Sequence, residues 1–206
     1  MAPAKKASSA YVWFDTEFTS LDLDKAHLLQ VSVMLTDKEL RRLTPPEDDL
    51  NLYVRVDEST PLSPWVQQNL PELVKKCRSR TAVPVEEIDD QLTEFIDRWC
   101  GTPIKTIQKR PLMAGNSVHN DWILVRKFCP KFVSRLHYRL LDVSTLKVQW
   151  FDMADGAEFD KQDTKLVKKY FPEADLRRLR QHDAYYDIVA SAAELAYYRA
   201  HMNFSS

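Results

Sequence analysis

Two acidic side chains end a strand-like run near the start of the chain. In the segment WFDTEF, Asp15 and Glu17 are two positions apart, and alternate residues of a β-strand point to the same face. Their carboxylates are therefore expected on one face, about 7 Å apart along the strand. The preceding residues, YVWF, belong in a core, where a carboxylate without a partner is unfavourable. A divalent cation is therefore the expected partner of this pair.

The spacing alone is a weak signal. Asp37 and Glu39 have the same spacing, and with 30 acidic residues in 206 such pairs arise by chance. Asp37 and Glu39 lie in a polar turn, whereas Asp15 and Glu17 follow an apolar run. The apolar flank therefore separates the candidate pair from the chance pair.

Three further residues fit the same chemistry. Asp121 follows an expected strand end in GNSVHNDWIL, and Asp187 lies in HDAYYDIVA, five residues after His182. Each acid alone is also explained as a helix-start residue, because the helix dipole and capping favour carboxylates there. A neutral imidazole beside the acids could serve as a general base, since it titrates near neutral pH.

The four acids become informative together, because each is expected at a strand end or a helix start, where the loops of an α/β sheet converge. Close carboxylates repel by about 4 kcal/mol per pair at an effective dielectric of about 20. Two divalent ions balance four negative charges, and all-oxygen ligation suits Mg²⁺ or Mn²⁺. Two such ions about 3.5 to 4 Å apart clamp the attacking and leaving oxygens of a phosphodiester. The set therefore predicts metal-dependent phosphodiester hydrolysis.

The elements that must position these residues follow from hydrophobic patterning. Strands are expected at 11–18, 28–35 and 51–56, helices at 64–77 and from 84 onward. A strand at 111–115 with a helix at 117–128, a strand within 137–144 with another helix, and a last helix at 183–202 follow. A meander followed by alternating β and α predicts an α/β fold with one mixed sheet and helices on both faces. We expect a disordered leader at 1–10 and a single domain at 11–206.

Composition excludes several other classes of protein. The formal net charge of −1 argues against a broad basic surface that coats nucleic acid, and three glycines leave no dinucleotide-binding motif or P-loop. Cys77, Cys100 and Cys129 have the spacing of neither a disulfide framework nor a zinc site, so we expect reduced core thiols. No segment has the roughly 20 apolar residues of a membrane span. We expect a soluble cytoplasmic protein, with the mitochondrion as the alternative because the leader is basic.

The order DxE, then Asp after GNS, then HxAxxD resembles the DEDDh branch of the DnaQ-like 3′-to-5′ exonucleases, which have a ribonuclease H-like fold. Within that branch, HYRLLDVSTLK at 137–147 and AELAYYR at 193–199 are similar to oligoribonuclease. The similarity runs from about residue 11 to residue 200. A tyrosine-based branch would need tyrosine four residues before Asp187, where this chain has Asp183.

This resemblance implies a role for each site residue. Asp15, Glu17, Asp121 and Asp187 would hold two Mg²⁺ or Mn²⁺ ions, and His182 would take a proton from the attacking water. Leu21 would wedge between the terminal bases and Trp65 would stack on one, although both residues also fit a core. The 5′ phosphate of a short single-stranded RNA would be held by Ser117, Arg139, Ser144 and Thr145, with Tyr138 reaching over from the partner of a homodimer. The products would be 5′-mononucleotides.

The chain departs from that family at three positions. Leu70 stands where the family has a histidine after the tryptophan, Ser20 replaces a usual glycine, and Trp122 replaces a usual arginine. The segment around Leu70 helps to define the end of the family's substrate pocket. A sibling exonuclease that trims longer RNA or DNA 3′ ends therefore stays open, as does a non-catalytic RNA-binding protein on the same fold.

Overall fold

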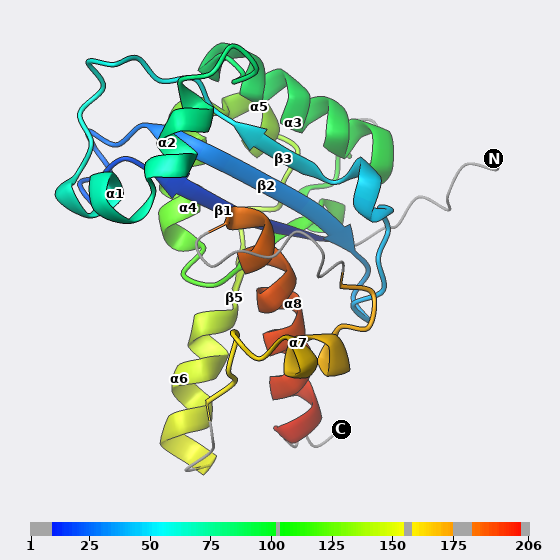
Figure 1. Cartoon of the computed structure of the whole chain (residues 1–206). Helices are drawn as coiled ribbons and strands as arrows, with labels where there is room; N and C mark the ends of the chain where they lie inside the picture. Colours follow the sequence, from blue (N-terminus) through cyan, green and yellow to red (C-terminus); the bar gives the residue numbers. More distant parts are fainter. Residues whose placement is uncertain (1–9, 102–103, 155–157, 175–182, 203–206) are drawn as a thin grey trace.

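A computed structural model describes residues 10–101, 104–154, 158–174 and 183–202. Its five strands form one mixed sheet in the order β3-β2-β1-β4-β5 (Figure 1). β1 pairs antiparallel with β2 and parallel with β4, while β3 is antiparallel to β2 and β5 is parallel to β4. The strands are β1 (Tyr11–Phe18), β2 (Leu28–Thr36), β3 (Leu50–Tyr53), β4 (Leu112–Gly115) and β5 (Leu140–Asp142). The predicted meander and mixed α/β sheet are confirmed.

Helices cover both faces of this sheet, as the sequence predicts (Figure 1). One face packs against α3, α4 and α5, and the other against α6, α7 and α8. α1 and α2 build a smaller apolar cluster against the β2 and β3 side. The helices are α1 (Pro64–Asn69), α2 (Pro71–Cys77), α3 (Val85–Cys100), α4 (His119–Phe128), α5 (Pro130–Val133), α6 (Val143–Ala154), α7 (Thr164–Tyr170) and α8 (Ala184–His201), with 3₁₀ turns at Pro46–Asp48 and Ile107–Lys109.

The central strand β1 distributes its side chains between the two cores. Val12 and Phe14 enter the core under α3, α4 and α5, while Trp13 enters the core under α8. Because side chains alternate along a strand, Asp15 and Glu17 continue on the face of Trp13, toward α8. The alternation of β1 therefore directs both acids to the helix that carries Asp187.

The end of β4 approaches β1 so closely that only glycine fits. A Cβ atom added to Gly115 would lie 2.7 Å from the carbonyl oxygen of Phe14, a distance that real Cβ atoms do not show. Phe14 directly precedes Asp15, and Gly115 directly precedes Asn116 and Ser117. The absent side chain thus lets the two strand ends that bear candidate site residues lie side by side.

Several predicted boundaries are wrong, each for a local reason. The helix expected at 64–77 breaks at Leu70, because Pro71 lacks an N–H and disfavours helical geometry in the residue before it. The strand expected within 137–144 covers only Leu140–Asp142, since the backbone N–H of Arg139 donates to Nδ1 of His137 in a turn. The helix expected from 117 begins at His119, because Ser117 has φ of 49°, which is outside the helical range.

Other expectations concern the leader, the thiols and the membrane. Residues 1–9 lie outside the described residues, while Ala10 is buried and its carbonyl accepts from the N–H of Leu112. The three cysteines are free and buried, and burial raises the pKa of each thiol to about 12, which confirms the predicted core thiols. Within the described segments, no helix is long and apolar enough to cross a membrane.

Candidate active site

Three of the four predicted metal ligands meet in one cluster. Each of Asp15, Glu17 and Asp187 offers a carboxylate oxygen, and these oxygens all lie within 4.8 Å of one another. Asp15 and Glu17 come from the end of β1, and Asp187 comes from the first turn of α8. All three residues are partly buried. Strand alternation and helix placement together create a compact set of hard oxygen donors.

The cluster is electrostatically unfavourable without a cation. Burial is the largest cause that raises the pKa of Glu17, to about 8, and repulsion from Asp187 and Asp121 adds to it. Burial and the same neighbours raise the pKa of Asp15 well above its usual value, opposed by the positive charge of Lys161. Buried carboxylates with raised pKa values are stabilised by a divalent ion, because the ion removes both the repulsion between them and the need for protonation. The donor set therefore fits a divalent metal.

Asp121 belongs to the same electrostatic group but takes part in a different contact. Its Oδ1 accepts from the backbone N–H of Thr16 at 2.9 Å and from the Thr16 hydroxyl at 2.6 Å. Burial raises the pKa of Asp121 to about 7 despite these hydrogen bonds. Thr16 lies between Asp15 and Glu17, so Asp121 on α4 is tied to the strand that carries both acids from the opposite face of the sheet.

The start of α8 is held by the neighbouring strand β2. Asp183 is the N-cap residue, and its side chain accepts from the N–H of Tyr185. Gln30, which is directly opposite Glu17 in the β1–β2 pairing, donates to Oδ1 of Asp183 at 2.9 Å and accepts from the N–H of Ala184. Asp183 therefore has a structural role, as a helix cap, and His182 lies outside the described residues.

A cleft of about 620 Å³ opens beside Glu17 and contains both predicted base contacts. Leu21 is 87% exposed and Trp65 is 49% exposed, so neither is a core residue. Ser63 caps α1 by accepting from the N–H of Val66, and its own N–H donates to the carbonyl of Thr19, which joins the two segments. An exposed leucine and an exposed tryptophan thus face one cleft next to the carboxylates.

The predicted phosphate contacts divide into a connected pair and three exposed neighbours. The N–H of Ser117 donates to Oγ of Ser144 at 2.9 Å, and the two hydroxyl oxygens are 3.3 Å apart. Ser117 has φ of 49°, in the left-handed region that costs a residue with a side chain about 1 to 2 kcal/mol. Asp142 accepts from the N–H groups of both serines.

The remaining three residues of the predicted phosphate site are exposed near β5. Thr145 follows Ser144 in the first turn of α6. Arg139 and Tyr138 precede β5, with the guanidinium carbon 5.5 Å from the centre of the tyrosine ring. Tyr138 is 57% exposed, which leaves its ring accessible to another molecule.

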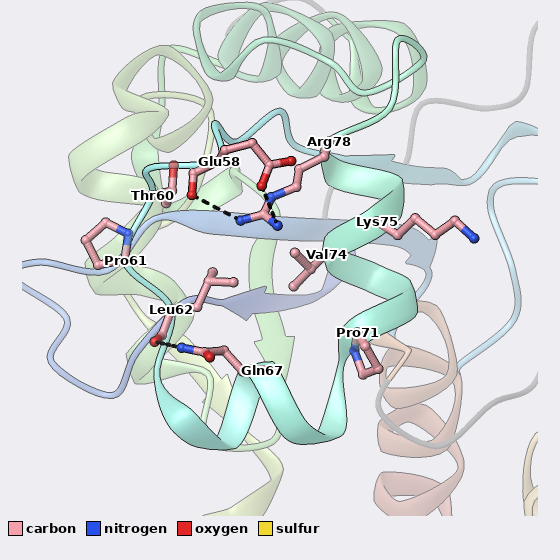
Figure 2. A pocket seen from close by; sticks show the side chains of 9 residues that line it. All are labelled: Glu58, Thr60, Pro61, Leu62, Gln67, Pro71, Val74, Lys75 and Arg78. Carbon is pink, nitrogen blue, oxygen red and sulfur yellow. Dashed lines mark hydrogen bonds and ion pairs between the residues drawn. The ribbon is translucent and has the colours of Figure 1, made fainter.

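A larger hollow of about 820 Å³ lies beside α1 and α2 (Figure 2). Arg78 projects into it but pairs with Glu58, and Gln67 donates to the carbonyl of Leu62. None of the predicted site residues line this hollow, and the glutamate and arginine that line it pair with each other. The acid cluster, and not the larger hollow, therefore defines the candidate active site.

The sequence did not point to three residues around the acids. Gln30 and Thr16 are polar residues on buried strands, which is the one signal that could have marked them. Lys161 lies 3.4 Å from Glu194 and also acts electrostatically on Asp15, yet it comes from the polar connection before α7, which has no distinguishing pattern. Leu70, at the family's histidine position, is buried with Leu29 and Val66 and does not face the cleft.

Comparison with known proteins agrees with this arrangement. Residues 12–195 match the family model described as Exonuclease (RNase_T). The probable oligoribonuclease of Schizosaccharomyces pombe is 30% identical over 195 residues, which cover 92% of this chain and 67% of that protein. The oligoribonuclease of Francisella tularensis is 29% identical over 193 residues, covering 91% and 93%.

A solved structure supplies the fold likeness. The zinc-bound complex of E. coli ExoI with single-stranded DNA superposes with a TM-score of 0.67 at 11% identity and covers 95% of this chain. This chain spans only 41% of the ExoI chain, so the likeness concerns the fold alone. The family match and the relatives at about 30% identity over most of their length show that the chain belongs to the RNase_T exonuclease family and, within it, to the oligoribonucleases.

Proposed function

We propose that this protein is a metal-dependent 3′-to-5′ exoribonuclease that degrades short single-stranded RNA to 5′-mononucleotides. The observation that carries the proposal is the cluster of Asp15, Glu17 and Asp187, whose oxygens lie within 4.8 Å, beside the cleft of Leu21 and Trp65. Membership of the oligoribonucleases supports the same reaction and substrate class.

Each residue of the site has a defined task in this reaction. Asp15, Glu17, Asp187 and Asp121 would hold two Mg²⁺ or Mn²⁺ ions, which supply charge stabilisation at the attacking and leaving oxygens. His182 would accept the proton of the water that attacks phosphorus. The bond from phosphorus to the 3′ oxygen breaks, the shortened RNA takes up a proton at that oxygen, and a 5′-mononucleotide leaves.

The substrate contacts follow the same logic. Leu21 would wedge between the terminal bases and Trp65 would stack on one of them; base–aromatic stacking is worth about 1 to 3 kcal/mol per base and accepts any base. Ser117, Ser144, Thr145 and Arg139 would hold the 5′ phosphate. The exposed ring of Tyr138 would come from the partner subunit of a homodimer, which light scattering at several protein concentrations can test.

Turnover of a labelled dinucleotide and a labelled 20-mer RNA tests the proposal. We expect cleavage of the dinucleotide with Mg²⁺ or Mn²⁺, no cleavage with excess EDTA, and none by the Asp15→Asn variant. Absence of metal-dependent cleavage of either substrate would leave the non-catalytic RNA-binding alternative, for which binding of the same RNA is the readout.

A second candidate is an exonuclease that trims longer RNA or DNA 3′ ends. Burial of Leu70 favours it, because the cleft then lacks a polar side chain at the position of the family's histidine. Faster turnover of the 20-mer than of the dinucleotide supports this candidate over the first.

A further inference from the structure

Glu194 is a fully buried carboxylate that the proposed chemistry does not use. It lies on α8 seven residues after Asp187, close to two full helical turns, so both acids project from the same side of the helix. A fully buried charge is unfavourable unless other groups compensate it. The contacts of Glu194 therefore show which groups compensate its charge and what the carboxylate holds in place.

Three groups surround this carboxylate. Its Oε2 accepts from Nδ2 of Asn116 at 2.8 Å and lies 3.4 Å from Nζ of Lys161. Its Oε1 accepts from the hydroxyl of Tyr198 at 2.9 Å. Asn116 directly follows Gly115 at the end of β4, so the carboxylate connects α8 with the strand end that carries Ser117.

The hydrogen bonds of Asn116 pass this constraint to the two serines. The Nδ2 group of Asn116 donates to Glu194 and to Oγ of Ser191, so the other end of the amide, Oδ1, faces Ser144 and accepts from its hydroxyl at 3.1 Å. The oxygen of Ser144 in turn accepts from the N–H of Ser117. Each link has one donor and one acceptor, so the direction of the whole chain is set at Glu194.

The backbone of Ser117 explains why such a constraint is needed. A serine with φ of 49° is in a conformation that surrounding contacts must maintain. Its N–H is held by Ser144 and by Asp142, and Ser144 is held by Asn116. Loss of the anchor at Glu194 would release the amide of Asn116 and, through Ser144, the position of the Ser117 hydroxyl.

We propose that Glu194 is a positioning residue that acts through Asn116 to fix the hydroxyl groups of Ser117 and Ser144 for contact with the 5′ phosphate of the RNA. This inference rests on the proposed function, because it assumes that these serines bind that phosphate. It adds a residue two helical turns beyond Asp187 on α8 that touches neither substrate nor metal.

The Glu194→Gln variant tests this role, because it keeps the shape of the side chain and removes one acceptor oxygen and the charge. With Tyr198 donating to its carbonyl, the new amide turns an N–H₂ group toward the N–H₂ group of Asn116. Loss of a charge-assisted hydrogen bond predicts a KM about tenfold higher for a 5′-phosphorylated dinucleotide. We expect kcat for this substrate, and both constants for the 5′-hydroxyl dinucleotide, to stay within about twofold.

A second variant separates positioning from folding. Combining Glu194→Gln with Asn116→Asp reverses donor and acceptor, so the glutamine amide donates to the new carboxylate, which still accepts from Ser144. We expect this double variant to regain most of the preference for the 5′ phosphate. Glu158→Gln, at an exposed glutamate that pairs with Lys147, is the matched control and keeps wild-type kinetics.

The outcomes are distinguishable. An equal fall for both dinucleotides, or an unchanged preference in folded Glu194→Gln protein, overturns the positioning role. Wild-type protein that cleaves RNA without preferring a 5′ phosphate refutes the phosphate assignment of the serines and this inference with it. Wild-type protein that cleaves neither dinucleotide nor longer RNA refutes the exonuclease proposal itself.

Discussion

Neutralising Glu17 should stabilise the metal-free protein at alkaline pH. The pKa of this carboxyl is raised from 4.5 to about 8 by burial and by Asp187 and Asp121. Between these pH values the folded protein holds the proton and the unfolded chain does not, so the free energy of unfolding falls as pH rises. A rise in pKa from 4.5 to about 8 corresponds to about 5 kcal/mol lost by pH 8.5.

The Glu17→Gln variant removes this loss. For a chain of this size, about 1 kcal/mol moves the melting temperature by about 2 to 4 °C. The largest expected rise in melting temperature of Glu17→Gln over wild type at pH 8.5 is therefore about 10 to 20 °C. At pH 5 the wild-type carboxyl is protonated, and we expect the two proteins to melt within about 2 °C of each other. The assay is thermal unfolding in EDTA at both pH values.

A measurement with metal and a control variant test whether the change in stability comes from the acid cluster. Saturating Mg²⁺ should raise the melting temperature of the wild type more than that of Glu17→Gln, because the variant lacks one of the proposed metal ligands. Glu39→Gln changes an exposed acid of the same DxE spacing, and surface changes are within about 0.5 kcal/mol. A Glu17→Gln protein no more stable than wild type at pH 8.5 without metal would refute the claim that burial and the neighbouring acids raise the pKa of Glu17.

Three other substitutions probe separate parts of the site. His182→Ala should lose roughly 10²- to 10⁴-fold in kcat while keeping the metal-induced rise in melting temperature, and a near-normal rate would remove His182 as the base. Gly115→Ala places a Cβ atom against the Phe14 carbonyl and should lower the free energy of unfolding by about 1 to 3 kcal/mol in urea titration. Gln30→Leu releases the start of α8 and should weaken metal affinity about 10- to 100-fold by calorimetry, whereas unchanged affinity would show that α8 needs no such anchor.

The order of elements was predictable because hydrophobic periodicity reports which side of an element is buried. The run YVWFDTEF has its core residues and its acids in one strand, so alternation alone assigned Asp15 and Glu17 to one face. The structure confirms that assignment and adds Asp187 from the predicted last helix. For these acids, the local sequence pattern was enough to predict where the fold places them.

Contacts between distant segments were not predictable from patterns of this kind. Gln30 and Asp183 are 153 residues apart, and nothing in either local sequence indicates that they form a hydrogen bond. Glu194 lies in an alanine-rich helix whose pattern indicates packing, and only the fold shows that Asn116 faces it. The residues proposed to bind metal have a recognisable type and spacing, whereas the residues that hold them in place do not.

The two substrate hypotheses differ in the charge that reaches Ser117 and Ser144. A terminal 5′ phosphate carries about −1.5 to −2 charges near neutral pH, whereas a phosphodiester inside a longer RNA carries one. Hydroxyl and backbone donors held in a fixed position bind the more highly charged group more strongly. If that contact sets the substrate preference, kcat/KM is highest for the 5′-phosphorylated dinucleotide despite the burial of Leu70. If instead the lack of a polar side chain at position 70 sets the substrate preference, the 20-mer is preferred. Removal of the 5′ phosphate then has no effect on either substrate.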